Sequence, residues 1–358
     1  MERRTRRPRI ADVAREAGVS KTAVSFAFNS PERLSTGTAS RILEVADLLG
    51  YRPNPVARLL TQPRTMTLGV LTPQALAVTF SNPFFAEFSE GVAQTAERLG
   101  YGLHFISPLH GSLALAVGRA TVDGVVAIGL SASHPEVGQI QAAGLPIVFV
   151  DSDDLPGHSS VVVDDEAGAR SAAEHLIALG HRDLAILAVE GPEGLASTGQ
   201  ADEFGVTARR LRGYRAAIEA ASVNLPAGRV FAGQASIAGG ADAFRGAWSA
   251  GHRPTGLLVM SDAMAIGAMS AARDLGVPVP DELSIVGFDD IDVAAHVEPP
   301  LTTVHQPIRE KGAVAARLLL GEIEQRDPRP ERRRLPTRLI VRGSSAAPPD
   351  RRELPTRA

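Results

Sequence analysis

The 358-residue chain contains no cysteine, which excludes disulfide bonds, cysteine-bound zinc and thiol nucleophiles together. No apolar run is long enough to span a membrane, and the arginine-rich start lacks the apolar core of a secretory signal. We therefore expect a cytoplasmic protein with no membrane partner. The sequence also lacks a phosphate-binding GxxxxGK[ST] loop, a GxSxG elbow, an HExxH pair and a GxGxxG turn after a strand. These absences predict a protein that is not an enzyme and has no cofactor and no metal.

The basic residues are unevenly distributed. Residues 1–64 contain 12 Lys and Arg against 6 Asp and Glu, whereas the whole chain contains 37 against 40. Five of these arginines lie within residues 1–9. A basic head on an acidic body predicts that only the head contacts nucleic acid, with the arginine arm placed on phosphates. A solvated arm with no partner is the alternative.

The stretch from Ile10 to Asn29 predicts two short helices joined by a tight turn. Asp12 is expected to cap the first helix, Gly18 to end it with a positive φ, and Ser20 to cap the second helix. This pattern is a helix-turn-helix, whose second helix, about residues 21–29, would lie in a major groove of DNA. A helical corner inside an ordinary domain is the alternative for these twenty residues alone.

A third helix is expected at about residues 38–49. Its apolar residues follow the spacing i, i+3, i+4, i+7 and would close a small core: Ile42, Val45, Ala46 and Leu49. Beyond Gly50, Asn54 as an N-cap and Pro55 at the first helical position predict a helix of two turns. Such a helix is marginal alone in water, so the segment is either a plain linker or a hinge that folds on a partner.

From Thr67 onward, buried strands alternate with amphipathic helices. Apolar runs predict strands at 68–71, 103–106, 122–128, 146–150, 184–187, 256–260 and 283–288. Helices are expected at about 83–99, 166–179, 206–221, 239–249, 263–275 and 307–321. Continuous apolar strands between helices indicate parallel sheets covered on both faces, and two such blocks indicate two lobes. Ligands of this architecture bind beyond the carboxyl ends of the strands, here between the lobes.

Ten ordered segments resemble the LacI/GalR family of bacterial transcription regulators over about residues 9–345. They are IADVAREAGVS, the LGYRPNPVARLL hinge, NPFF at 82–85, VDGVV at 122–126, HLIALGHR at 175–182, RLRGYRAAI at 210–218, MSDAMAIGAM at 260–269, VPDELSIVGFDD at 279–290, PPLTTVHQP at 299–307 and LPTRLIVRGSS at 335–345. The resemblance implies a dimeric repressor with an all-α helix-turn-helix domain and a two-lobed α/β core like periplasmic sugar-binding proteins. An effector bound between the lobes would change the affinity for an operator.

The predicted domains follow from these patterns together. They are a DNA-binding domain at 8–52, a hinge helix and linker at 53–66, an effector-binding and dimerisation core at 67–343 and a disordered tail at 344–358. Within the core, lobe 1 is expected at about 67–163 and 306–334, and lobe 2 at about 164–305 and 335–343.

The resemblance implies which residues of the second helix read DNA: Ser20, Lys21, Thr22, Ala23, Ser25, Phe26 and Asn29. The chain departs from the family pattern S-T-V-S-R, because Ala23 replaces a hydroxyl residue and Phe26 replaces a basic residue that can bind guanine through two hydrogen bonds. Phe26 can instead contact a thymine methyl group, or it can pack inside the domain. We expect an operator that differs from the common one at the position that Phe26 faces.

In the hinge, Leu60 matches the leucine that such regulators insert into the central minor-groove step of their DNA. Val56 and Ala57 would line the same face, and Arg58 would reach a phosphate. Two hinge helices must pack together for this, which predicts a homodimer on double-stranded, pseudo-palindromic operator DNA. Packing of Leu60 between hinge and core is the alternative.

The resemblance also implies the residues that contact a small-molecule effector: Phe84, Phe85, Asp151, Arg210, Asp262 and Asp289. Carboxylates, an arginine fork and aromatic faces suit a sugar. One phenylalanine can belong to the core instead, and Asp262 can be the N-cap of the following helix. An aromatic residue that the family often has in the second lobe is missing near Ser236, so the effector can also be a nucleobase or another metabolite. Whether the effector acts as an inducer or as a corepressor is likewise undecided. A sugar transport protein, which the basic head opposes, and a sugar-modifying enzyme are the other classes.

Overall fold

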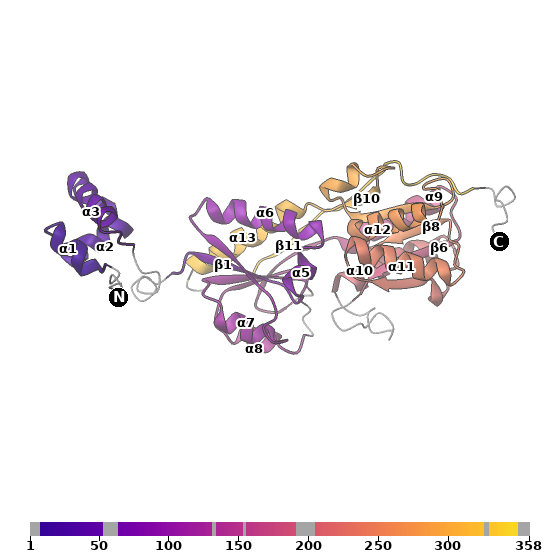
Figure 1. Cartoon of the computed structure of the whole chain (residues 1–358). Coiled ribbons are helices and arrows are strands. Elements are labelled where there is room, and N and C mark those ends of the chain that lie inside the picture. The colour runs from indigo at the N-terminus through magenta and orange to yellow at the C-terminus, as the bar shows by residue number, and fades with distance from the viewer. Residues whose placement is uncertain are drawn as a thin grey trace. The chain divides into compact units, whose positions relative to one another are not determined.

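The computed structural model describes residues 8–52, 64–130, 134–152, 155–190, 205–325 and 329–349. The chain divides into two compact units, residues 1–65 and 66–358, which we call the head and the core (Figure 1). Within the described residues, no helix is both long enough and apolar enough to cross a membrane.

The head is a bundle of short helices. It contains α1 (Ile10–Glu16), α2 (Lys21–Asn29), the 3₁₀ turn η1 (Pro31–Arg33) and α3 (Thr36–Leu48). Val13, Val24 and Ile42 are fully buried and bring one residue of each α-helix into the centre. The helix-turn-helix predicted from the sequence is therefore confirmed.

The ends of the helices match the prediction in part. Gly18 has a φ of +66°, and the Ser20 hydroxyl accepts a hydrogen bond of 3.1 Å from the Ala23 N–H, as an N-cap does. The prediction for Asp12 is wrong, because α1 begins earlier, after Arg9. Asp12 occupies the third helical position, where its carboxylate reaches back to accept from the Arg9 N–H at 2.9 Å. Leu49, expected in the core, is 37 % exposed because α3 ends one residue before it.

Lobe 1 of the core is a sheet in the order β11-β5-β4-β3-β1-β2, with every neighbouring pair parallel. Its strands are β1 (Thr67–Leu71), β2 (Gly102–Ile106), β3 (Gly124–Ile128), β4 (Ile147–Val150), β5 (Ser159–Val163) and β11 (Arg332–Leu335). Its helices are α5 (Leu76–Thr79), α6 (Pro83–Glu97), α7 (Leu113–Arg119), α8 (Val137–Gln141) and α13 (Ile308–Glu324). Residues of α6 and α13 pack in one apolar cluster, and residues of α7 and α8 pack in another with the opposite side of the sheet.

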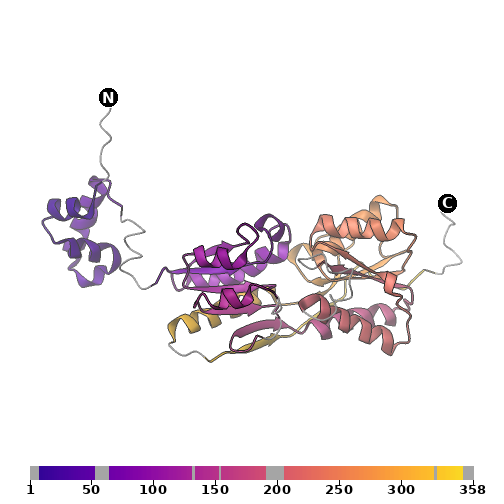
Figure 2. The same cartoon turned by 90° about the horizontal axis from the view of Figure 1, so that it is seen from below.

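Lobe 2 repeats this arrangement with the order β12-β10-β9-β8-β6-β7. Its strands are β6 (Leu184–Val189), β7 (Val230–Gly233), β8 (Gly256–Val259), β9 (Ser284–Asp289), β10 (Thr302–His305) and β12 (Arg338–Ile340), and only β12 runs antiparallel to its neighbour. Its helices are α9 (Asp165–Ala178), α10 (Gly205–Ala220), α11 (Ile237–Ser249) and α12 (Asp262–Asp274), with the short turns η4 (Ala227–Arg229) and η5 (Asp292–Ala295). Figure 2 shows helices on both sides of each sheet, as parallel strands require.

The chain passes between the two sheets three times. It leaves lobe 1 between β5 and α9, returns between β10 and α13, and leaves again between β11 and β12. These passages place the carboxyl ends of several strands next to the junction of the lobes.

Two glycines let α6 and α13 approach each other through their backbones. A Cβ on Gly91 would lie 1.9 Å from the Arg309 carbonyl oxygen, and a Cβ on Gly312 would lie 2.2 Å from that of Phe88. No larger residue fits at either position without moving a helix. This contact fixes the start of α13, including Lys311, against lobe 1.

The tail does not begin at residue 344 as predicted. Ser344 is fully buried and donates to the Ile285 carbonyl at 2.6 Å, and the Ala346 N–H donates to the Ser284 hydroxyl at 3.0 Å. Two histidines also hold the segment: His181 contacts the Ala346 carbonyl at 2.9 Å, and His175 contacts the Ser345 hydroxyl. Hydrogen bonds that composition does not reveal therefore extend the core to Ala346, and residues 350–358 lie outside the described part of the chain.

Candidate functional site

Helix α2, the second helix of the helix-turn-helix, has one buried and one open side. Val24 and Ala27 are buried, whereas Lys21, Thr22 and Asn29 are exposed. Ser25 is half-buried, and the Asn29 amide donates to its carbonyl at 3.0 Å and to its hydroxyl at 3.3 Å. These residues therefore form a polar surface on the open side.

Ala23 and Phe26 depart from the family pattern in different ways. Ala23 packs in part against the apolar core of the head. Phe26 is half-buried, but it is not among the residues that pack against this core. Its ring instead lies under the guanidinium of Arg33, with 5.2 Å between the ring centroid and the guanidinium carbon. Four hinge residues predicted to contact DNA lie outside the described residues: Val56, Ala57, Arg58 and Leu60.

In the core, two of the predicted effector residues follow parallel strands in strained backbone. Asp151 comes directly after β4 with a φ of +56°, and Asp289 ends β9 with a φ of +125°. Side chains other than glycine rarely adopt such values, and residues held in them are concentrated at functional sites. Both carboxylates are buried.

These two carboxylates belong to a closed circuit of seven residues joined by polar contacts, which we call the polar ring: Asp151, Lys311, Gln306, Asp289, Arg210, Asp165 and Arg209. On one side, the Lys311 ammonium contacts both carboxylate oxygens of Asp151 at 2.8 and 2.7 Å and also donates to the side-chain Oε1 of Gln306. The Gln306 amide in turn donates to Asp289 at 2.6 Å. This half of the ring joins α13 of lobe 1 to β9 of lobe 2.

The other half of the polar ring lies on α9 and α10. Arg210 approaches Asp289 to 3.6 Å and donates to Asp165 at 2.9 Å, and it also donates to the Met260 carbonyl. Arg209 contacts the second oxygen of Asp165 at 3.0 Å and closes the circuit by donating to the backbone carbonyl of Asp151 at 3.3 Å. The ring thus spans both lobes.

Aromatic faces lie against the two buried cations. The guanidinium carbon of Arg210 lies 3.6 Å from the ring centroid of Phe288, and the Lys311 ammonium lies 5.3 Å from that of Phe84. Phe84 is buried and stacks on Phe88, whereas Phe85 is only partly buried and meets Phe84 edge to face. Of the predicted pair, Phe84 is the one that contacts the polar ring.

Asp262 is fully buried beside the polar ring, but its carboxylate is already engaged. Its oxygens accept a hydrogen bond of 3.1 Å from the Ile291 N–H and one of 2.5 Å from the Thr303 hydroxyl. It is the first residue of α12, and Ser261 takes the N-cap position. Burial and the neighbouring Asp289 raise the pKa of Asp262 to about 8, so this group is mainly protonated at neutral pH.

The charges of the polar ring balance. Burial raises the pKa of Asp289 to about 6, against the opposing effect of Arg210, so Asp289 is mainly ionised at neutral pH. Arg210 and Arg209 hold the pKa of Asp165 below its usual range despite its burial. Three carboxylates therefore face three cations. Within the described residues, no cluster of histidine and carboxylate side chains is suited to hold a metal ion.

Sequence reasoning missed Lys311, Gln306, Asp165 and Arg209. Lys311 is one of only two lysines in the chain, and it is fully buried. Its rarity in an arginine-rich chain was the available signal. Asp165 resembles an ordinary acidic residue in the first turn of a helix, and nothing in its neighbours predicts an ion pair with α10.

A helix-turn-helix head joined to a two-lobed core is the organisation of a DNA-binding transcriptional regulator, and comparisons with known proteins agree. Residues 9–54 match the model of bacterial regulatory proteins of the lacI family, and residues 173–345 match that of a periplasmic binding protein-like domain. The chain is 35 % identical to the HTH-type transcriptional regulator Rv3575c of Mycobacterium tuberculosis, over 96 % of this chain and 98 % of that one. It is 32 % identical to the ribose operon repressor of Escherichia coli, over 93 % and 98 %.

Two solved structures extend the similarity to the fold. A lac repressor dimer bound to operator and an anti-inducer matches with a TM-score of 0.77 and 28 % identity, over 96 % of this chain and all of that one. A complex of the transcriptional regulator CelR with cellobiose matches with a TM-score of 0.68 and 30 % identity, over 94 % and 100 %. The chain belongs to the LacI family of bacterial transcriptional regulators.

Proposed function

We propose that this protein is a repressor whose affinity for a pseudo-palindromic operator is controlled by a neutral, polyhydroxylated small molecule, a sugar or sugar derivative, bound at the polar ring. The observation that carries the proposal is the ring itself, which joins carboxylates at the ends of β4 and β9 to cations from both lobes. Hydroxyl groups can donate to Asp151 and Asp289 while they accept from Lys311 and Arg210.

Charge balance favours a neutral effector. Because the polar ring has equal numbers of cations and anions at neutral pH, a charged ligand would leave one buried charge without a partner. A sugar adds no charge, and it can present an apolar face to Phe84. Two similar proteins, a ribose operon repressor and a transcriptional regulator in complex with cellobiose, support the same class of ligand.

The action on DNA follows from linkage. An effector that binds one arrangement of the lobes better than the other shifts their equilibrium, and a coupling of ~1–3 kcal/mol changes operator affinity ~5–150-fold. The proposed domains are a DNA-binding domain at 8–52, a hinge at 53–66 and an effector core at 67–346. Because its partner is chromosomal DNA, we place the protein in the bacterial cytoplasm.

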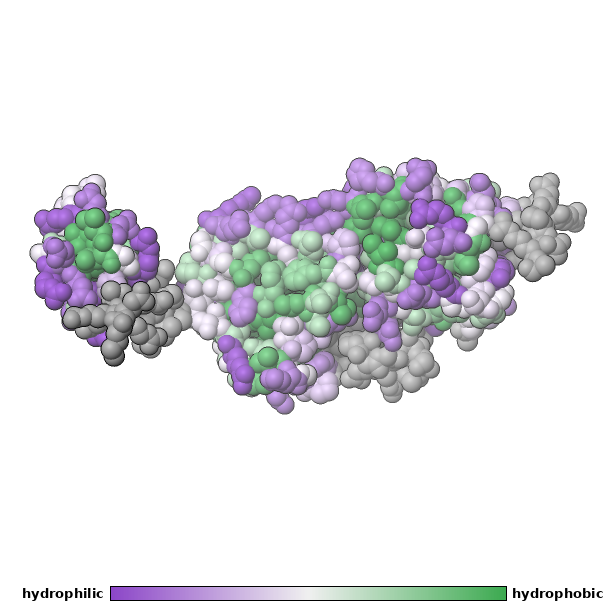
Figure 3. Space-filling model, in the orientation of Figure 1, coloured by the Kyte–Doolittle hydropathy of each residue, from purple (hydrophilic) through white to green (hydrophobic). Residues whose placement is uncertain are grey.

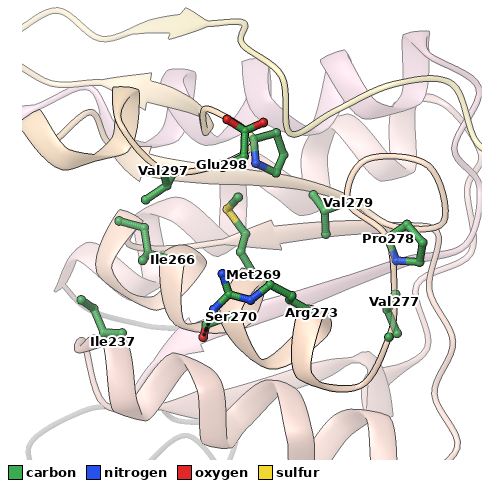
Figure 4. A pocket seen from close by; sticks show the side chains of 12 residues that line it. Ile237, Ile266, Met269, Ser270, Arg273, Val277, Pro278, Val279, Val297 and Glu298 are labelled. Carbon is green, nitrogen blue, oxygen red and sulfur yellow. Dashed lines mark hydrogen bonds between the residues drawn. The ribbon is translucent and has the colours of Figure 1, made fainter.

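A second copy of the chain is the proposed occupant of an apolar groove on lobe 2, with a volume of about 620 Å³. Ile266 and Met269 of α12 lie in this groove with Val277, Val279 and Val297 around them (Figure 4). Figure 3 shows hydrophobic residues gathered over the same part of lobe 2. A self-complementary surface suits a two-fold dimer, and the related lac repressor structure is described as a dimer on operator.

The test begins with selection of double-stranded DNA from a random library by the full chain, followed by binding to the enriched site with and without each member of a sugar panel. We expect one sugar to change operator affinity within the range above. Arg210→Gln should abolish that response, whereas Arg212→Gln, an exposed change on the same helix, should retain it. The effector proposal would be contradicted if no sugar of the panel altered operator affinity and if Arg210→Gln and Arg212→Gln bound the operator alike.

A further inference from the structure

The recognition helix carries little positive charge of its own. Lys21 is its first residue, and no basic residue occurs in its last turn. Phe26 lies on the open side, on the same helical face as Thr22, at the position where the family pattern has a base-reading cation. A helix that reads guanine from this position therefore needs a cation from another part of the head.

Arg33 supplies a cation at this place. It ends η1, seven residues beyond Phe26, and its guanidinium lies over the Phe26 ring at 5.2 Å. The turn is fixed by hydrogen bonds of 3.0 Å from the Arg33 N–H to the Ser30 carbonyl and from the Leu34 N–H to the Pro31 carbonyl. Leu34 packs against the core of the head and anchors the end of the turn.

The environment of Arg33 differs from that of two other arginines in the head. Arg15 pairs with Asp12 at 2.9 Å, and Arg52 pairs with Asp47 at 2.5 Å. Arg33 is exposed, and among the described residues it forms no ion pair. Its contact with the Phe26 ring leaves the guanidinium N–H groups open to solvent.

Stacking suits an arginine that must bind a base. The flat guanidinium packs on an aromatic ring while its N–H groups stay in the plane and point outward, and this fork can bind guanine O6 and N7 together. The ring also restricts the side chain before DNA arrives, which lowers the entropy lost on binding.

We infer that Arg33 reads a guanine in each half-site of the operator, and that Phe26 acts as its positioning residue by holding the guanidinium against its ring. The inference rests on the proposed operator binding and extends it to one base pair. It also replaces both alternatives given for Phe26 from the sequence, because the ring lies against the Arg33 guanidinium and is not among the residues that pack in the core of the head.

The experiment compares base preferences from selection with the full chain and four variants: Arg33→Ala, Phe26→Leu, Phe26→Tyr and Arg41→Ala. Arg41 is an exposed arginine of α3 and controls for the loss of one positive charge. Arg33→Ala should reduce the preference for guanine at one position of each half-site by ~5–150-fold, the range for loss of a bidentate contact. Phe26→Leu should weaken the preference at the same position, and Phe26→Tyr, which keeps the ring, should retain it.

Binding to random DNA and thermal unfolding of each variant accompany the selection. If Arg33→Ala and Arg41→Ala lower operator and random-DNA affinity equally without changing any base preference, Arg33 contributes only charge and the inference is wrong. A change of preference in Phe26→Leu but not in Arg33→Ala would show that the ring reads the base directly and would also overturn it. If the unmodified chain enriches no site at all, the proposed function fails, which is a different result.

Discussion

The buried acid Asp262 gives a stability prediction with a definite sign. Its pKa is raised to about 8, whereas an unfolded chain leaves an aspartate near its ordinary value of about 4. The folded protein therefore retains a proton that the unfolded protein has lost. A raised pKa of this kind contributes stability at low pH, and the contribution disappears as the pH rises through the folded pKa.

The magnitude follows from the same two pKa values. Between about pH 6.5 and about pH 8.5, Asp262 is ionised in the unfolded chain, whereas in the folded chain it changes from mainly protonated to mainly ionised. Over this range the contribution of Asp262 to the free energy of unfolding therefore falls by about 2 kcal/mol. Asp262→Asn keeps the shape of the side chain, can still accept from the Ile291 N–H, and does not titrate. The free energy of unfolding of the native chain, relative to this variant, should therefore fall by about 2 kcal/mol over that range.

Urea denaturation of both proteins across this pH range measures the difference directly. Titrating groups that do not interact with Asp262, such as His175 and His181, are common to both chains and cancel in the comparison. Asp274→Asn, an exposed change on the same helix, should show no such trend. If the difference between the native chain and Asp262→Asn stays constant within about 0.5 kcal/mol, Asp262 is ionised in the fold and the reasoning from its raised pKa is wrong.

Three further predictions concern the ion pair, the dimer and the hinge. Lys311→Met should destabilise the core by about 3–5 kcal/mol in urea denaturation, because it leaves a buried carboxylate unpaired. The double variant Lys311→Met, Asp151→Asn should recover most of this loss, and equal destabilisation of the single and double variants would refute the reasoning. Ile266→Asp should weaken dimerisation by roughly 100-fold in sedimentation velocity, because it places a charge in the apolar groove. Leu99→Asp, an exposed change on lobe 1, should leave dimerisation unchanged. If Ile266→Asp also leaves dimerisation unchanged, the groove is not the interface. Leu60→Ala should weaken operator binding far more than random-DNA binding, and equal losses would argue against its insertion between base pairs.

The strands that the sequence predicted are mainly apolar, such as β3 and β8. It did not predict β5, which begins with Ser159 and Ser160, or β10, which begins with Thr302 and Thr303. These four side chains are buried, but their composition resembles that of a loop. Apolar runs therefore identify strands built mainly of apolar residues, whereas strands that begin with buried hydroxyl groups are recognised only once their neighbours are in place.

The candidate site shows the same limit. Motif resemblance identified Asp151, Arg210 and Asp289, which the structure brings into one circuit. It did not identify Lys311 or Gln306, because their positions depend on the packing of α13 against α6 through Gly91 and Gly312. A contact between helices more than 200 residues apart leaves no local signal in the sequence.

The three passages of the chain between the lobes have a consequence for how such proteins can change by recombination. The head joins the core through a single stretch of chain, so one crossover near residue 65 exchanges it for another head. Neither lobe is continuous in sequence, and replacing one lobe would require several simultaneous junctions. The DNA-binding head can therefore be inherited as a module, whereas the two lobes of the core are inherited together.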